Sequence, residues 1–196
     1  SVSETMDLST PPLQLVDTGN DPGGTQGARI VTDKLTNEDY IEKTYGGNLD
    51  RCASEFIANR IYQAMGVNAP TSYMHKGAVV SKWMPFLERF KFNHSHTPAS
   101  VQKNKTGAKA FYGGHKDVKD GFVVDAWLAN WDVFGLWYDN ILKKPDGGFT
   151  RVDSGGALFY RAQGQPKPGF GGEEVSEIVA MRNPQVAREA ANIFKG

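Results

Sequence analysis

A stretch in the second half of the chain carries the residue types that hold a divalent cation. Residues 130–158 read NWDVFGLWYDNILKKPDGGFTRVDSGGAL. Magnesium prefers hard oxygen ligands, usually one or two carboxylates together with substrate phosphates. Asn140 and Asp153 can supply such ligands from adjacent strand ends, and Asp132 can orient a hydroxyl group and accept its proton. The alternative interpretation is that Asp-Asn and Asp-Ser-Gly-Gly are plain turns.

A glycine-rich segment, DPGGTQGAR at residues 21–29, precedes this stretch in the chain. Its glycines allow the backbone to bend tightly and to approach a ligand closely, and successive backbone N–H groups can surround phosphate oxygens. No Gly-Lys-Ser/Thr follows, so it is not a Walker A loop, and taken alone it is more often a turn. The residues expected to contact phosphate are Gly23, Gly24, Thr25, Gln26 and Gly27.

A lysine follows the glycine-rich segment: Lys43 lies sixteen residues after Gly27, in the predicted strand YIEKTY. A strand lysine behind a glycine-rich hairpin can reach the phosphates of a nucleotide. Glu55 lies in the first turns of the next predicted helix and can pair with Lys43; Asp50 is the alternative partner. The alternative interpretation is that Lys43 is a solvated strand lysine and Glu55 an exposed glutamate, which is favourable near a helix N-terminus.

The elements that position these residues in the first part of the chain are mostly strands. Residues 1–12 are polar, end in Pro-Pro and are expected to be flexible. Alternating residues around the polar TDKLTNED turn predict a hairpin, and apolar spacing predicts a helix that Gly66 ends. The remaining elements follow from short apolar runs. The predicted ranges are a short apolar stretch at 13–16, the hairpin through 28–41, the helix at 51–65, and strands at 67–73 and 77–83.

The second part of the chain has a more helical pattern. Residues 93–120 are polar and are expected to form an exposed loop with a short helix. Residues 121–131 predict a helix, and the Pro-Asp-Gly-Gly turn predicts a hairpin between residues 141–142 and 150–152. A final helix is expected from about 173 to 194.

This order of elements predicts an α+β fold in one domain with two unequal lobes. We expect the N-lobe at about residues 13–85 and the C-lobe at about 86–196. A cleft between lobes is a natural ligand site.

Composition argues against several classes of partner. The 196 residues hold 22 Lys and Arg and 22 Asp and Glu, so the formal net charge is zero. A zero net charge removes the overall electrostatic argument for nucleic acid or an anionic membrane. One cysteine excludes an intramolecular disulfide and favours a reducing environment, and no run is apolar enough for a transmembrane helix or signal peptide. We expect a soluble monomer.

The ordered set of a glycine-rich hairpin, Lys43, Glu55, Asp132, Asn140 and Asp153 resembles the protein-kinase-like superfamily. The spacing of thirteen from Asn140 to Asp153 is that between the catalytic-loop Asn and the metal-binding Asp of typical kinases. SEFIANRIYQAMGVNAP followed by VVSKW looks like the helix, strand and hinge of the HipA and phosphatidylinositol-kinase branch. The resemblance covers roughly residues 13–160 and implies a minimal bilobal kinase-like fold with a β-rich N-lobe and a reduced helical C-lobe.

The resemblance also implies roles and ligands. ATP and Mg²⁺ would be the cofactors, with Lys43 holding phosphates, Glu55 holding Lys43, Asn140 and Asp153 binding the metal, and Asp132 as the base. The acceptor implied is a protein Ser/Thr hydroxyl. The short chain resembles the HopBF type of bacterial effector kinase, which is injected into host cytoplasm and phosphorylates a heat-shock chaperone. The alternatives are a small-molecule or lipid kinase and a non-catalytic pseudokinase.

Several departures from the typical kinase pattern bear on these roles. Asn130-Trp131-Asp132 replaces His-Arg-Asp, and the gap from Asp132 to Asn140 is eight where typical kinases have five. Asp125 and Asp139 are therefore alternative bases. Asp-Ser-Gly replaces Asp-Phe-Gly at Asp153. Residues 159–172 would be a short activation-loop equivalent without an obvious phosphorylation site, which suggests a constitutively active enzyme.

The remaining reactive side chains have structural interpretations. The four histidines and Cys52 do not have a metal-ligand spacing, and Cys52 is expected to be structural. Four aromatic residues are expected in the core rather than as a base-stacking surface, and three lysines are expected in a solvated loop. These residues are Trp127, Trp131, Trp137 and Tyr138, and Lys103, Lys105 and Lys109.

Overall fold

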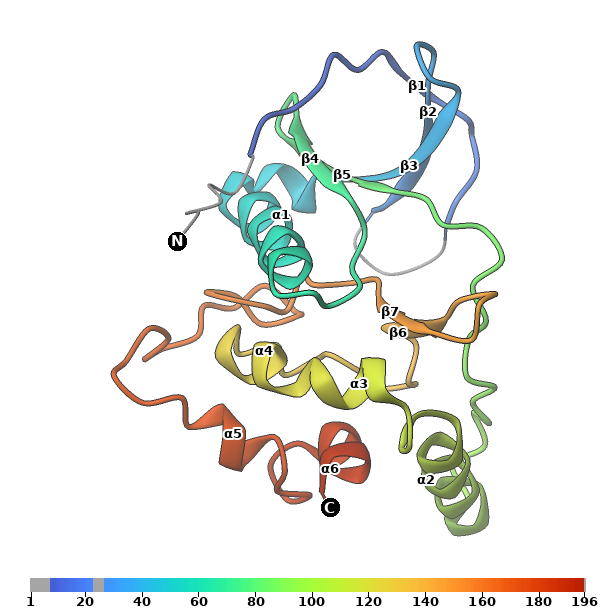
Figure 1. Cartoon of the computed structure of the whole chain (residues 1–196), viewed down its shortest axis with the longest axis vertical. Helices are drawn as coiled ribbons and strands as arrows, with labels where there is room; N and C mark the ends of the chain where they lie inside the picture. The colour runs from blue at the N-terminus through green and yellow to red at the C-terminus, as the bar shows by residue number, and fades with distance from the viewer. Residues whose placement is uncertain (1–7, 23–26, 196) are drawn as a thin grey trace. The chain divides into compact units, whose positions relative to one another are not determined.

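The computed structural model describes residues 8–22 and 27–195. The chain divides into two compact units, and the boundary lies between Pro85 and Phe86. The first unit contains an antiparallel sheet with one α-helix, and the second consists mainly of helices and turns with one short hairpin (Figure 1). The predicted α+β class is therefore confirmed.

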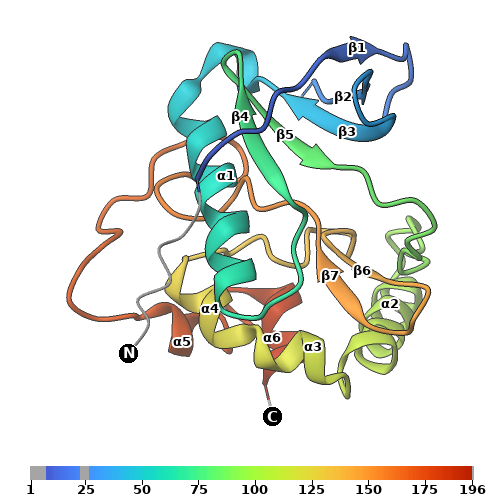
Figure 2. The same cartoon turned by 45° about the horizontal axis from the view of Figure 1, so that its top comes forward.

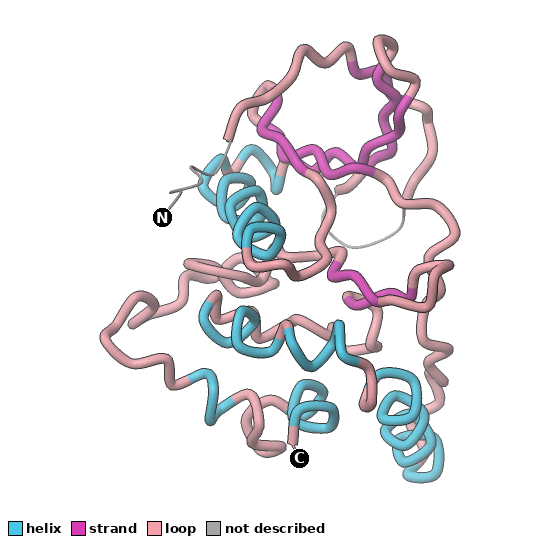
Figure 3. Tube along the Cα trace, viewed as in Figure 1, coloured by secondary structure: helices cyan, strands magenta, loops and turns pink. Residues whose placement is uncertain are grey.

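The first unit is built on a 5-stranded antiparallel sheet with the order β1-β2-β3-β5-β4. The predicted hairpin forms β2 and β3, in which Val31 pairs with Tyr40 and both side chains pack against Val80. Figure 3 shows that the strands curl into an open arc. The strands are β1 (Leu15–Asp17), β2 (Arg29–Asp33), β3 (Glu38–Lys43), β4 (Ser72–His75) and β5 (Ala78–Lys82).

One long helix, α1 (Leu49–Ala64), packs against β4 and β5 (Figure 2). The side chain of Asn48 accepts a hydrogen bond from the Arg51 amide, which satisfies one of the unpaired N–H groups at the helix start. Cys52 and Phe56 lie on its buried side. The apolar residues that predicted the helix do not all face the core, because Ile57 and Met65 are exposed. Prediction was less accurate after the helix: β4 begins at Ser72, not at residue 67.

The elements of the second unit pack in pairs around one core. α3 lies against β7, α4 lies beside α5, and α2 lies beside α6. None of the described helices has the length and hydropathy needed to cross a bilayer. The elements are α2 (Pro98–Tyr112), α3 (Lys116–Asp120), α4 (Phe122–Trp127), β6 (Ile141–Lys143), β7 (Phe149–Arg151), α5 (Glu177–Ala180) and α6 (Arg188–Phe194).

The exposed loop predicted at residues 93–120 is wrong, because most of this segment is helical. Thr97 accepts a hydrogen bond from the Ser100 amide and Pro98 occupies the first turn, which is a favourable helix start. The buried positions of α2 recur every four residues at Ser100, Asn104, Ala108 and Tyr112. Three of these side chains are small or polar, so the sequence lacks the apolar stripe by which a buried helix face is usually recognised. Lys103, Lys105 and Lys109 lie on the exposed faces of this helix.

Two further predictions about the second unit are corrected. The single helix predicted at about 173–194 is instead α5 and α6, separated by turns around Pro184, which cannot donate a helix hydrogen bond. The expectation of buried tryptophans fails for Trp127 and Trp137, which are 53% and 50% exposed. Tyr138 is buried as expected, and Trp131 is partly buried against the core.

A buried ion pair joins α4 to β7 at the centre of this unit. Arg151 Nε and Nη2 each donate to a different carboxylate oxygen of Asp125 at 2.6 Å. The guanidinium also donates to the backbone carbonyls of Asp117 and Val118, both at 3.2 Å. A Cβ atom at Gly121 would collide with this guanidinium, so the position requires glycine. Arg151 therefore fixes β7 against the α3–α4 segment.

We predict that Asp125→Asn strongly destabilises the protein. Removing one partner of a buried ion pair leaves an uncompensated charge and typically costs about 3–5 kcal/mol. The measurement is the free energy of unfolding from urea denaturation. Asp120→Asn is the matched control, because Asp120 forms an exposed pair with Lys116 one helical turn away, and its urea midpoint should barely move. Equal behaviour of the two variants would contradict the central role of Arg151.

Candidate functional site

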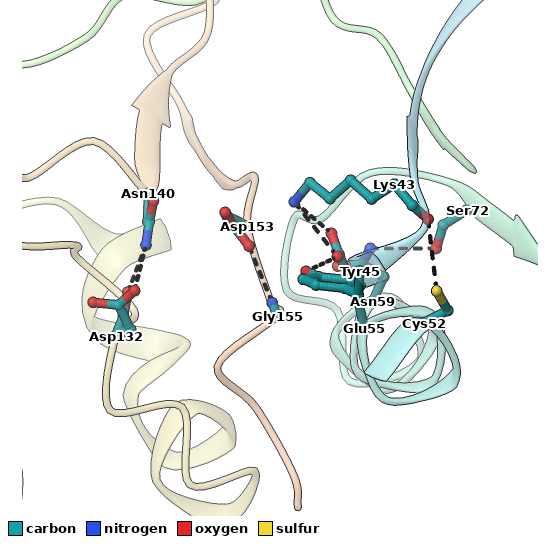
Figure 4. A network of polar contacts seen from close by, with 10 residues as sticks. All are labelled: Lys43, Tyr45, Cys52, Glu55, Asn59, Ser72, Asp132, Asn140, Asp153 and Gly155. Carbon is teal, nitrogen blue, oxygen red and sulfur yellow. Dashed lines mark hydrogen bonds and ion pairs between the residues drawn. The ribbon is translucent and has the colours of Figure 1, made fainter. Parts of the chain in front are cut away.

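The strand β3 carries Lys43 at its end, and α1 carries Glu55. Lys43 Nζ lies 3.1 Å from one carboxylate oxygen of Glu55 and 3.4 Å from the other. Both side chains are buried, with exposed fractions of 9% and 1%. The register that pairs Lys43 with Val79 places the lysine beside the strand on which α1 packs. The ion pair predicted from the sequence is therefore present (Figure 4).

Tyr45 is a third member of this group that the sequence did not suggest. Its hydroxyl donates to Glu55 Oε2, the oxygen that is farther from Lys43. The Tyr45 backbone has φ 49°, which is unusual for a bulky residue, and the Arg51 guanidinium lies 4.2 Å from the ring centroid. Tyr45 is thus held in an uncommon conformation from which it orients Glu55. Nothing in the local sequence pattern signals this contact.

The other acidic residues near Lys43 are engaged elsewhere or exposed. Glu42 pairs across the hairpin with Arg29 at 2.5 Å, and Asp50, the alternative partner from sequence, is exposed in the first turn of α1. Glu55 is therefore the acidic partner that the fold presents to Lys43.

In the second unit, the residues from Asp132 to Asn140 form a compact loop of consecutive turns. The Gly135 amide donates to the Asp132 carbonyl at 2.9 Å, and the Asn140 amide donates to the Phe134 carbonyl at 3.2 Å. Gly135 has φ 70°, and a Cβ atom there would collide with the Asp139 carboxylate. The extra residues of the eight-residue spacing are accommodated by this folded loop.

The loop is closed by the side chain of Asn140. Its Nδ2 donates to the Asp132 carbonyl at 2.7 Å and lies 3.4 Å from Asp132 Oδ2 (Figure 4). Because the amide nitrogen faces Asp132, the amide oxygen is directed away from the loop. The fold thus brings Asp132 and Asn140 together despite the unusual spacing.

Asp153 is placed beside Asn140 by the β6–β7 hairpin. The Val152 amide donates to the Asn140 carbonyl at 3.0 Å, which continues the pairing of the two strands. The Gly155 amide donates to Asp153 Oδ1 at 3.1 Å and so orients the carboxylate (Figure 4). The strand pairing therefore brings Asn140 and Asp153 to neighbouring strand ends.

Burial and neighbouring carboxylates raise the pKa of two aspartates in this loop. Burial, followed by repulsion from Asp153 and Asp139, raises the pKa of Asp132 to about 6, while the hydrogen bond from Asn140 opposes the shift. Burial also raises the pKa of Asp139. Among the described residues, no group of three or more His, Cys, Asp or Glu side chains is arranged to hold a metal ion.

The structure also separates the candidate bases. Asp125 is buried and doubly bonded to Arg151, so it is committed to a structural ion pair. Asp132 and Asp139 both lie on the loop that Asn140 closes. We retain Asp132 as the candidate, because its carboxylate directly approaches Asn140.

The glycine-rich segment is described only in part. Gly23, Gly24, Thr25 and Gln26 lie outside the described residues, and Gly27 lies just before β2.

Cys52 is buried, and burial raises the pKa of its thiol, which suits a structural residue.

Comparison with known proteins identifies the fold but not the family. No protein-family model and no curated protein matches the sequence. The Helicobacter pylori proinflammatory kinase CtkA matches with a TM-score of 0.50 and 19% identity, over 75% of this chain and 60% of that one. The choline kinase LicA from Streptococcus pneumoniae matches with a TM-score of 0.39 and 12% identity, over 69% and 62%.

The likeness to CtkA establishes that the fold is kinase-like. This chain spans 60% of the length of CtkA and 62% of that of LicA.

We predict that Tyr45→Phe weakens the Lys43–Glu55 group. A hydrogen bond to a charged partner contributes about 1.5–3 kcal/mol, and the substitution removes it while keeping the ring. The free energy of unfolding should fall by about that amount in urea denaturation. The control is Tyr40→Phe, whose hydroxyl donates at 3.1 Å to Glu38, a carboxylate at the surface, so its loss should be smaller. An equally mild Tyr45→Phe would show that the hydroxyl does not hold Glu55.

We predict that Asp132→Asn stabilises the protein only above mildly acidic pH. The folded-state pKa rises from 3.8 to about 6, so the folded state keeps a proton that the unfolded state loses, and stability falls between these values as pH rises. Removing the charge should raise the free energy of unfolding at pH 7.5 by on the order of 1–2 kcal/mol. Thermal unfolding in EDTA should show this gain at pH 7.5 and not at pH 3.5; a gain independent of pH would contradict the assignment.

Proposed function

We propose that this chain is an ATP- and magnesium-dependent phosphotransferase that acts on a protein Ser/Thr hydroxyl. The observation that carries the proposal is the buried Lys43–Glu55 ion pair, formed between a strand and the following helix of a kinase-like fold. In protein kinases this lysine contacts the phosphates of ATP and depends on the helix glutamate for its position.

The residues of the second unit fit a magnesium ion bound with nucleotide. Asn140 offers an amide oxygen and Asp153 a carboxylate, which are hard oxygen donors from neighbouring strand ends. Magnesium in phosphotransferases takes one or two carboxylates and completes its shell with phosphate oxygens and water. When bound, the metal would neutralise charge developing on the transferred phosphoryl group.

Asp132 is proposed to receive the acceptor hydroxyl. Its carboxylate is partly buried beside Asn140, and its pKa, raised to about 6, is close to the working pH of a general base. The proton of the attacking hydroxyl would pass to Asp132 as the oxygen bonds to the γ-phosphorus and the bond to ADP breaks. Most of the acceleration would come from positioning and electrostatics.

The acceptor class rests on resemblance rather than on geometry. The order of motifs resembles the HipA branch and the HopBF type of effector kinase, and CtkA, of similar fold, is described as a proinflammatory kinase of a bacterium. These likenesses support a bacterial effector that is secreted into a host cell and acts on a host protein, with a heat-shock chaperone as the first substrate to test. A small-molecule acceptor or a pseudokinase is the alternative outcome of the experiments.

The first test is nucleotide binding. Ligand at 100 times its Kd stabilises the native state by about 2.7 kcal/mol. ATP with magnesium should therefore raise the melting temperature, and ATP with EDTA should raise it less. Absence of any shift at millimolar nucleotide, in a folded sample, would exclude the kinase interpretation. Labelling a eukaryotic lysate with radioactive ATP then separates protein acceptors from small alcohols.

The second test separates Asp153 from Asp132. Asp153→Ala removes a metal carboxylate, so nucleotide binding should lose its magnesium dependence and phosphoryl transfer should nearly vanish. Asp132→Ala removes only the group that orients the hydroxyl, so nucleotide affinity should persist while turnover falls on the order of 10²–10⁴-fold. Circular dichroism confirms folding of both. Full turnover in Asp132→Ala would move the base to Asp139.

A further inference from the structure

A lysine outside the expected site binds both loops that carry the acidic residues. Lys167 Nζ donates to the Ala129 carbonyl and to the Gly156 carbonyl, each at 2.6 Å. Ala129 lies three residues before Asp132, and Gly156 lies three residues after Asp153. One side chain therefore connects the acceptor loop to the metal loop.

The backbone around Lys167 is held in a small hairpin. Tyr160 and Pro166 form an isolated bridge, the Arg161 amide donates to the Gln165 carbonyl at 2.8 Å, and the Lys167 amide donates to Phe159 at 2.8 Å. These bonds fix where the lysine side chain leaves the segment 159–172. The segment proposed as an activation-loop equivalent is thus ordered without any modification.

A direct backbone bond runs beside the lysine contacts. The Leu158 amide donates to the Leu128 carbonyl at 2.6 Å, and these residues neighbour the chain positions that Lys167 binds. The two loops are therefore joined by one backbone bond and by two bonds to one ammonium group. Loss of the ammonium group should expose the backbone bond to solvent exchange.

Removing a lysine ammonium group from water at this position costs free energy that its hydrogen bonds must offset. Burial lowers the pKa of Lys167 to about 7, against the opposing attraction of Glu177. A partly buried ammonium group is retained only when hydrogen bonds compensate for its lost hydration. Its acceptors are two carbonyls on the loops that carry the proposed active residues.

We propose that Lys167 is a positioning residue that clamps the Asp132 loop to the Asp153 loop and docks the 159–172 segment onto both. In many kinases the activation loop is ordered by phosphorylation, through new pairs between arginine and phosphate. In this chain an unmodified lysine would do the same, so the proposed enzyme would need no phosphorylation to order this segment. The inference rests on the proposed function, because clamping matters only if these loops carry the reacting groups.

The experiment compares Lys167→Met with Arg161→Met in the full chain. Both variants remove one positive charge from the same segment. Arg161 is exposed, and its charge lowers the pKa of Lys167, so its removal should leave the clamp intact. Hydrogen exchange measured by mass spectrometry on peptides covering residues 128–132 and 154–158 reports the clamp without any need for activity. Lys167→Met should speed exchange there on the order of 10-fold, as expected for loss of a charge-assisted hydrogen bond, and Arg161→Met should not.

Turnover provides the second readout. Lys167→Met should lower kcat on the order of 10²-fold, because small displacements of reacting groups have such effects, while KM for ATP stays within about threefold. Lys167→Arg, which keeps a cationic donor, should restore part of the loss. If Lys167→Met fails to fold, the same measurements on Lys167→Gln decide the question. Exchange and kcat equal to those of Arg161→Met would overturn the clamp.

Failure of the clamp and failure of the proposed function are distinguishable. A wild-type protein that transfers no phosphate would refute the function, while faster exchange in Lys167→Met would still support the clamp. An active wild-type protein whose exchange and kcat do not respond to Lys167→Met would refute the clamp alone.

Discussion

The guanidinium of Arg151 is buried in the core of the second unit, and its hydrogen bonds set how the elements around it pack. A buried charge is tolerated only with a partner and with its remaining donors bonded. Arg151 obtains these from Asp125 and from the carbonyls of Asp117 and Val118, so the α3–α4 segment and β7 are fixed against each other. Asp153 follows Arg151 by two residues. The position of the proposed metal ligand is therefore set by a structural ion pair that has no part in the chemistry.

In the first unit, a buried charge is also satisfied by a partner, and here the pair belongs to the proposed active site. Lys43 and Glu55 are both buried, and the Tyr45 hydroxyl gives the carboxylate a second donor. A carboxylate that accepts from two directions has few alternative orientations, which keeps Lys43 in one place. The left-handed backbone at Tyr45 is the strain that this arrangement requires. Each unit thus uses a buried polar network of its own to position its share of the candidate site residues.

The sequence predicted the features that depend on neighbours in the chain. The β2–β3 hairpin, α1, the β6–β7 hairpin and the Lys43–Glu55 pair all follow from local turns, helical spacing and a strand-to-helix order. It missed α2, because the buried face of that helix holds Ser100 and Asn104 instead of an apolar stripe. It also missed Arg151–Asp125, whose partners are 26 residues apart, and Lys167, whose acceptors are backbone carbonyls that no side-chain pattern marks.

In the second unit, the carboxylates that the proposed reaction needs lower the stability of the fold. Asp132, Asp139 and Asp153 repel one another, and the raised pKa of Asp132, about 6, is the measure of that repulsion together with burial. A fold selected for stability alone would replace one of these carboxylates by an amide. If the proposed metal site is correct, a bound divalent cation would offset part of this repulsion. The raised pKa of Asp132 is then a cost in stability that the proposed reaction would justify.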